Sequence, residues 1–190
     1  MSVKIVYQTL EDLDNPDSIE LNGPFKCKFE NAWLGRGYYF WESIIENAHW
    51  WGTECNSYKD GYVICKASYD SDDELCFNLI DNYEHLSKFK DTIDLMKKKG
   101  LYKSNTTVAR VIYYLKDTLK IFNYQAARVY GVHSKSKDSD YMLNLSFNPN
   151  GHQYLDLLPA IQVCFYSKNS LNLRNYHIVY PDKYIEDYLV

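Results

Sequence analysis

The stretch from Leu34 to Trp50 reads L-G-R-G-Y-Y-F-W-E-S-I-I-E-N-A-H-W and is the most informative part of the chain. Its two glycines allow the backbone to approach another group closely, and an aromatic run follows them at once. From Glu42 the apolar residues take helical spacing, which predicts a helix that ends near Gly52. The pattern Gly35-x-Gly37 is not the dinucleotide fingerprint, because the third glycine and the preceding strand are missing.

Short runs rich in β-branched residues predict strands on both sides of this stretch. The predicted strands are Val3–Leu10, Gly61–Ser68, Ala126–Val132, Leu143–Phe147, Ile161–Tyr166 and Asn175–Tyr180. Helical spacing marks Glu84–Lys99 and Thr106–Phe122, whereas the polar stretch Glu11–Ser18 is typical of turns. Strands at both ends with helices mainly between them favour an α+β fold over a regularly alternating parallel fold.

Length and composition fit one soluble domain over residues 1–190. Apolar residues make up 46% and charged residues 24%, which excludes a disordered or collagen-like chain. No apolar run approaches the ~18 residues of a membrane span, and the N-terminus lacks a secretory signal pattern, so we expect a cytoplasmic protein without a membrane partner. The net charge of −4 excludes a global positive field for nucleic acid.

The five cysteines and five histidines show no spacing that indicates a chemical site. The cysteines contain no C-x-x-C pair, which argues against a disulfide framework and against a zinc site. No paired histidine motif is present, and neither Ser43 nor Cys55 lies in a nucleophile motif. We therefore expect no metal and no hydrolase of the serine or cysteine type.

The central stretch resembles the second conserved block of ADP-ribosyltransferases, above all those similar to poly(ADP-ribose) polymerases and diphtheria toxin. The matching positions are Gly35, Gly37, Tyr39, Phe40, Ala48 and Trp50. The resemblance implies that Tyr39 and Trp50 sandwich the nicotinamide ring of NAD. It also implies that Asn47 hydrogen-bonds the carboxamide, and that Gly37 belongs to the NAD site.

Two outer blocks resemble the same family in position but carry changed signature residues. In the family, the first strand carries a His that binds the adenosine ribose and a Gly whose backbone holds the carboxamide. Gln8 and Thr9 stand at these places. The third block begins its strand with a catalytic Glu, and here that position is Gln162. The resemblance thus implies catalytic roles for Gln162 and Tyr39, and NAD contacts for Gln8 and Thr9.

The resemblance implies a fold of two small packed sheets that form an NAD cleft with flanking helices. The helical insert of about residues 81–122 lies outside it. It implies transfer of ADP-ribose from NAD to a macromolecule, as in bacterial or phage-related toxins and effectors. The acidic net charge slightly favours a protein acceptor over nucleic acid, and an antitoxin or immunity protein would be a further partner.

The neutral Gln162 leaves three explanations open. The chemistry is naturally altered or lost, a toxic enzyme has been made harmless by a Glu→Gln change, or another group such as Glu42 acts in its place. The alternative function is a catalytically impaired module that binds NAD or a partner on the same fold. A relative of RNA 2′-phosphotransferases is a third hypothesis, but the arginine and histidine set of those enzymes is not evident.

Overall fold

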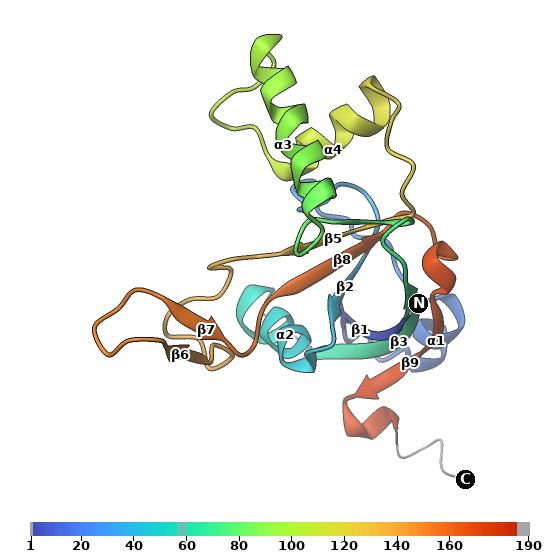
Figure 1. The fold of residues 1–190 in the computed structure, drawn as a ribbon. Coiled ribbons are helices and arrows are strands. Elements are labelled where there is room, and N and C mark those ends of the chain that lie inside the picture. Colours follow the sequence, from blue (N-terminus) through green and yellow to red (C-terminus); the bar gives the residue numbers. More distant parts are fainter. Residues whose placement is uncertain (1, 57, 59, 186–190) are drawn as a thin grey trace.

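A twisted sheet of seven strands forms the body of the molecule in the computed structural model, which describes residues 2–56, 58 and 60–185 (Figure 1). The order of the strands is β4-β5-β8-β2-β1-β3-β9. Their bounds are β1 Ser2–Glu11, β2 Tyr38–Glu42, β3 Tyr62–Ser71, β4 Cys76–Asn78, β5 Ala126–Tyr130, β8 Ile161–Phe165 and β9 Arg174–Tyr180. All neighbours are antiparallel except β4 and β5, which are parallel.

A separate two-stranded hairpin and a few helices complete the fold, so the predicted α+β class is confirmed. The hairpin consists of β6 (Asn144–Ser146) and β7 (Tyr154–Asp156). The helices are α1 Pro16–Asn22, α2 Ile45–Trp50, α3 Tyr83–Lys98 and α4 Val108–Tyr113, with single 3-10 turns at Ser170–Asn172 and Asp182–Tyr184. Both α2 and α4 continue into a wider π-turn, at Trp51–Cys55 and Tyr114–Thr118.

The structure differs from the sequence prediction at three kinds of place. The aromatic run is strand β2, and the following helix begins at Ile45 rather than Glu42. Part of the predicted turn is helix α1, which Pro16 begins with a backbone angle suited to the first helical turn. Strands β4 and β7 were not predicted, because three residues are too few to show a period.

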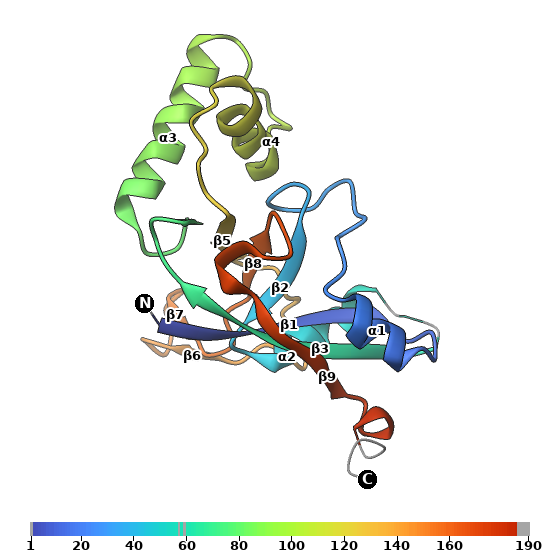
Figure 2. The same cartoon turned by 90° about the vertical axis from the view of Figure 1, so that its right-hand side faces the viewer.

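The predicted pair of packed sheets is instead one sheet that splits along its length. β1 and β2 pair only at Val6–Glu42 and Tyr7–Trp41. Beyond these pairs the two strands diverge, and β2 rises away from β1 while β1, β3 and β9 stay together (Figure 2). The two residue pairs between β1 and β2 are enough to join the two parts into one continuous sheet.

Apolar side chains pack on both faces of the sheet. Val6, Phe40 and Val163 belong to the cluster on one face, and Phe77 and Cys164 belong to the cluster on the other. The predicted helical insert of about residues 81–122 contains α3 and α4, which stand together on one side of the sheet (Figure 1). The insert is anchored because Ile112 and Leu115 enter the same cluster as Phe77.

Candidate functional site

A cavity of about 620 Å³ opens where β1 and β2 diverge. Its walls come from β1, β2, β8 and the segment 25–33, which runs between α1 and β2. Three tryptophans, Trp33, Trp41 and Trp51, are among the aromatic residues of the wall. The volume lies within the ~300–1,000 Å³ of small-molecule sites, so the cavity is large enough for an organic ligand.

Four of the residues predicted for the site line this cavity. They are Gln8 and Thr9 on β1, Tyr39 on β2 and Gln162 on β8. Pairing of β8 with β2, and of β2 with β1, brings these three distant sequence segments together. Strand pairing thus gives the predicted blocks a common cavity.

Gln8 fills the split between β1 and β2 with its side-chain amide. Nε2 donates to the carbonyl oxygens of Phe25 at 2.8 Å and Tyr39 at 3.3 Å. Oε1 accepts from the Phe25 N–H at 3.0 Å and from the Tyr176 hydroxyl at 2.9 Å. All four hydrogen-bonding positions of this amide are therefore used to hold the cavity wall.

Tyr39 presents its ring to the cavity and anchors the turn that precedes β2 with its hydroxyl. The hydroxyl donates to the Gly35 carbonyl at 2.6 Å and accepts from the Leu34 N–H at 2.8 Å. Burial raises the pKa of this phenol far above its usual value, so it stays protonated. The Tyr39 side chain is thus a fixed, neutral part of the cavity wall, and its phenol does not act as a base.

Gln162 has a buried side chain with unused hydrogen-bonding capacity. It is 7% exposed and lines the cavity from β8, opposite Trp41 in the strand register. Its Oε1 makes no hydrogen bond with the described residues. Because an unpaired buried carbonyl costs ~1–3 kcal/mol, this oxygen is a ready acceptor for a ligand hydroxyl or N–H.

The structure separates Trp50 and Asn47 from the cavity wall. Trp50 is 4% exposed and packs against Trp41 with ring centroids 5.5 Å apart. Asn47 is fully buried, and its Nδ2 donates to the Pro159 carbonyl at 3.0 Å while its Oδ1 has no partner among the described residues. The half-buried Trp51, which is not among the site residues predicted from the sequence, lines the cavity instead.

Thr9 and Gly37 maintain the geometry around the cavity. The Thr9 hydroxyl donates to the Ala48 carbonyl at 2.8 Å and so ties β1 to helix α2. Gly37 approaches β8 so closely that a Cβ there would lie 2.3 Å from the Cys164 Sγ and 2.6 Å from the Phe165 carbonyl oxygen. The sequence did not predict the hydrogen bond of Thr9 to Ala48. For the approach of Gly37 to β8, the glycine itself was the only signal in the sequence.

Two lysines give part of the cavity a positive charge. Lys26 and Lys28 are exposed and line the cavity from the segment 25–33, and Glu11 is the one acidic residue among the described lining residues. Lysine ammonium groups bind phosphate as point charges. Arg36, which lies between Gly35 and Gly37, is exposed and does not line the cavity.

Glu42, the carboxylate named as a substitute for Gln162, serves another purpose. It is 4% exposed, and Arg128 donates to it from Nε at 2.9 Å and from Nη2 at 2.8 Å. Lys4 and the Tyr69 hydroxyl also contact it, at 3.1 Å and 2.7 Å. These partners hold the pKa of the carboxyl below its usual value despite its burial, so Glu42 is a bound structural anion.

The described residues contain no group of three or more His, Cys, Asp and Glu side chains that could hold a metal ion. The exposed Cys55 is not an activated nucleophile, because partial burial and the nearby Glu54 raise its thiol pKa to about 11. Within residues 2–56, 58 and 60–185, no helix is long and apolar enough to cross a membrane.

Comparison with known proteins gives no relative for this chain. No family model matches the sequence, and neither the curated proteins nor the solved structures contain a significant match.

Proposed function

We propose that this chain binds NAD in the cavity between β1 and β2 and transfers ADP-ribose from it to a macromolecular target, the activity of the ADP-ribosyltransferases that its sequence resembles. The single observation that carries the proposal is the convergence of Gln8, Tyr39 and Gln162 on one cavity. Each of these three residues comes from one of the three sequence blocks that resemble that family, and Gln8 and Gln162 stand at the positions of the family's His and Glu. A chance resemblance in three separate segments would not require them to meet.

The chemistry of the wall supports a dinucleotide ligand. The tryptophan rings and Tyr39 offer flat apolar surfaces on which nicotinamide or adenine can stack. Lys26 and Lys28 offer positive charge to a pyrophosphate. The free Oε1 of Gln162 can accept a hydrogen bond from a ribose hydroxyl.

The reaction would break the bond between the nicotinamide nitrogen and C1′ of the ribose. Nicotinamide leaves with the electron pair, positive charge develops on the ribose, and a nucleophile of the acceptor forms the new bond to C1′ and releases its proton to water. Gln162 can orient the ribose, but its neutral amide stabilises that charge less than a carboxylate would. We therefore expect slow transfer by this chain.

Titration with NAD tests the binding step. Stacking of nicotinamide or adenine on the wall should quench tryptophan fluorescence, and radiolabelled NAD incubated with the chain and candidate acceptors should leave label on macromolecules. The proposal would be contradicted if NAD neither quenched the tryptophan fluorescence nor raised the unfolding temperature of the chain.

Substitution of Gln162 tests the transfer step. Gln162→Glu should raise transfer or NAD hydrolysis by ~10²-fold, because a carboxylate stabilises charge that exists only in the transition state. NAD affinity should change much less. Gln153→Glu adds the same charge at an exposed position and should leave both quantities unchanged.

A second candidate is a module that binds NAD or a partner without chemistry. It is favoured by the neutral side chain of Gln162 and by the engagement of Glu42 with Arg128. NAD binding without turnover in both the unmodified chain and Gln162→Glu would select this candidate. Equal turnover in both would instead assign the chemistry to another residue.

A further inference from the structure

The β6–β7 hairpin has its apolar and polar sides reversed relative to an ordinary sheet packed on a core. Its polar side chains Asn144, Tyr154 and Asp156 are half-buried. The large apolar side chains of the hairpin and its flanks are exposed instead, by between 46% and 66%: Leu143, Leu145, Phe147, Leu155 and Leu157. In an antiparallel sheet the apolar side normally packs against the core.

Contacts with the body fix this orientation. The Tyr130 hydroxyl on β5 donates to Asp156 Oδ2 at 2.6 Å. The Tyr154 hydroxyl lies 3.1 Å from Nδ1 of His133. Both contacts come from the polar side, so the hairpin cannot turn its apolar side inward without losing them.

The exposed apolar side chains form one surface, which we call the hairpin face (Leu143, Leu145, Phe147, Leu155 and Leu157). Leu145 and Leu155 are directly opposite in the strand register. Hydrogen bonds from the Leu157 N–H to the Leu143 carbonyl and from the Phe147 N–H to the Gln153 carbonyl extend the ladder on both sides. The period of two along each strand then puts all five side chains on the same side of the hairpin.

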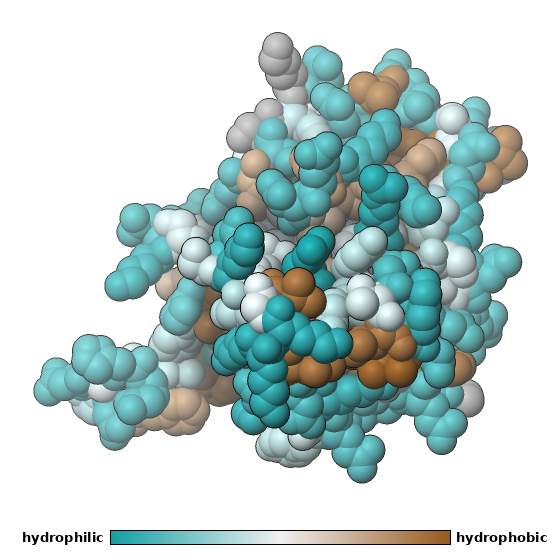
Figure 3. All heavy atoms as spheres, turned by 90° about the horizontal axis from the view of Figure 1, so that it is seen from above, coloured by the Kyte–Doolittle hydropathy of each residue, from teal (hydrophilic) through white to brown (hydrophobic). Residues whose placement is uncertain are grey.

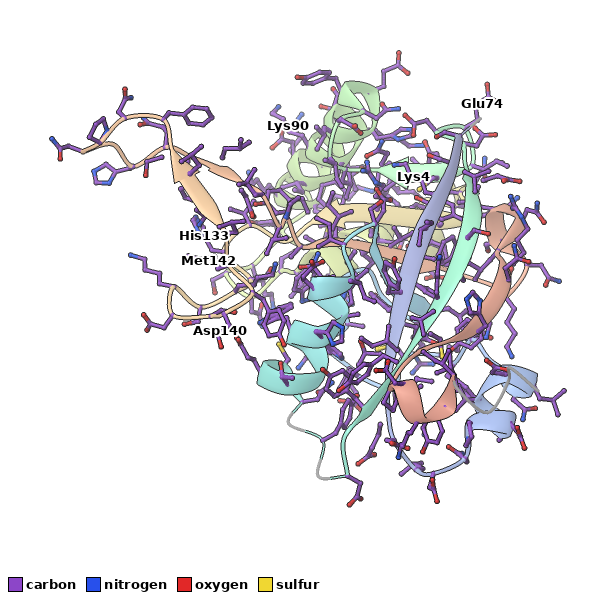
Figure 4. The ribbon with its side chains drawn as sticks, turned by 90° about the horizontal axis from the view of Figure 1, so that it is seen from below. Lys4, Glu74, Lys90, His133, Asp140 and Met142 are labelled. Atoms are coloured by element: carbon purple, nitrogen blue, oxygen red, sulfur yellow. The ribbon has the colours of Figure 1, made fainter. Side chains whose placement is uncertain are left out.

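The hairpin projects away from the rest of the molecule. From the side of α3 and α4 it forms a separate lobe (Figure 3). From the opposite side it reaches outward beside the loop marked by His133, Asp140 and Met142 (Figure 4). A second molecule could therefore approach the hairpin face without meeting the sheet first.

We propose that the hairpin face is a homodimer interface, covered by the same face of a second copy of this chain. At roughly 150–200 Å² for a fully exposed large apolar side chain, the exposed fractions amount to about 400–550 Å² per copy. Complete burial of these side chains in two copies would remove about 1,000 Å² from solvent, which is the size that a biological interface needs to reach. Face-to-face packing about a two-fold axis brings Leu145 and Leu155 of both copies to its centre.

The distribution of charge favours a second copy over a charged partner. Between residues 141 and 160 the only acidic or basic side chains are His152, which lies in the turn, and Asp156, which faces Tyr130. The hairpin face itself carries no charge, so two identical faces meet without repulsion. An isolated two-stranded hairpin is also only marginally stable, and stacking two of them gives a four-stranded core.

The test is the oligomeric state of two matched variants. We expect the unmodified chain to sediment as a concentration-dependent dimer, and Leu145→Glu to raise the dimer dissociation constant by ~100-fold or more. Ser146→Glu introduces the same charge on the neighbouring residue, whose side chain lies on the other side of the hairpin, and should leave the dimer intact. A monomeric unmodified chain, or an undiminished Leu145→Glu dimer, would overturn the proposal.

A crosslinking measurement keeps the test decisive if Leu145→Glu unfolds the hairpin instead of only blocking the interface. In a Cys55→Ser background, which removes the exposed native thiol, Leu145→Cys should form an intermolecular disulfide under mild oxidation. Ser146→Cys should form little. Equal crosslinking of both, or of neither, would contradict the hairpin-face dimer. The proposal does not depend on NAD, so its failure would leave the proposed function untouched.

Discussion

At the scale of single residues, two adjacent tryptophans illustrate how a one-residue difference changes a role. Trp50 matches the family position for nicotinamide stacking, but it is packed among Trp41, Ala48 and Ile64. Trp51 follows it in the sequence and lines the cavity. Trp50 is the last residue of α2 and Trp51 is the first residue of the π-turn that follows, so the helical rotation points these neighbouring side chains in different directions.

Alanine substitution of each tryptophan separates stability from binding. Trp51→Ala should weaken NAD binding by ~1–3 kcal/mol, the scale of an aromatic stack on a flat base. Trp50→Ala should lower the free energy of unfolding by ~3–5 kcal/mol, because it leaves a large hole in the core. Fluorescence titration and urea denaturation measure the two effects. A stable Trp50→Ala with weakened NAD binding would restore the prediction made from the sequence.

At the scale of elements, the contact between β2 and β8 holds two of the three predicted blocks together. Tyr39 pairs with Cys164 and Trp41 with Gln162. Gly37, directly before β2, lies close to β8. Its carbonyl also accepts a hydrogen bond from the Cys27 N–H at 2.9 Å. The glycine is thus required by packing, whatever ligand the cavity takes.

We predict that Gly37→Ala destabilises the protein by ~1–3 kcal/mol or more, because the new Cβ would overlap the Cys164 Sγ and the Phe165 carbonyl. Urea denaturation measures the change. Gly151→Ala is the matched control: its Cβ would come no closer than 3.1 Å, to the end of the Gln153 side chain, and little change is expected. A neutral Gly37→Ala would refute the close β2–β8 approach.

At the scale of the whole molecule, one buried ion pair ties several strands together. Glu42 on β2 contacts Lys4 on β1, Tyr69 on β3 and Arg128 on β5. The pair is shielded from solvent, so loss of one partner leaves an uncompensated charge in the core. Removal of one partner of such a pair costs ~3–5 kcal/mol.

This network predicts a dependence of stability on pH. The pKa of Glu42 is lowered in the folded protein, chiefly by Arg128 acting against the effect of burial. Its contribution is therefore fully present above the ordinary value of 4.5 and is lost as the pH falls through the folded pKa. Urea denaturation from pH 7 to pH 3 should show this loss.

Glu42→Gln provides the comparison for that measurement. The variant should be less stable than the unmodified chain at pH 7, and the difference should shrink toward pH 3. Asp94→Asn removes an exposed carboxylate bonded to Lys90 and should follow the unmodified chain. A constant difference between Glu42→Gln and the unmodified chain at all pH values would refute the role of the ionised carboxylate.

The sequence by itself determined what depends on local periodicity. Alternation and β-branched runs located β1, β3, β5, β8 and β9 to within a few residues, and helical spacing located α3. Each of these patterns is produced by side chains that are neighbours along the chain. The sequence also identified Gln8, Thr9, Tyr39 and Gln162, which line one cavity, although their roles toward NAD stay predictions.

Only the tertiary structure decided which of these strands and helices lie next to one another. The split between β1 and β2 follows from the register of two residue pairs, and the engagement of Glu42 follows from an arginine 86 positions away. Trp51 belongs to the cavity wall, although it lies in the π-turn after α2 and outside the strands that line the cavity. Strand order and register act between segments far apart in the chain, and no local pattern encodes them.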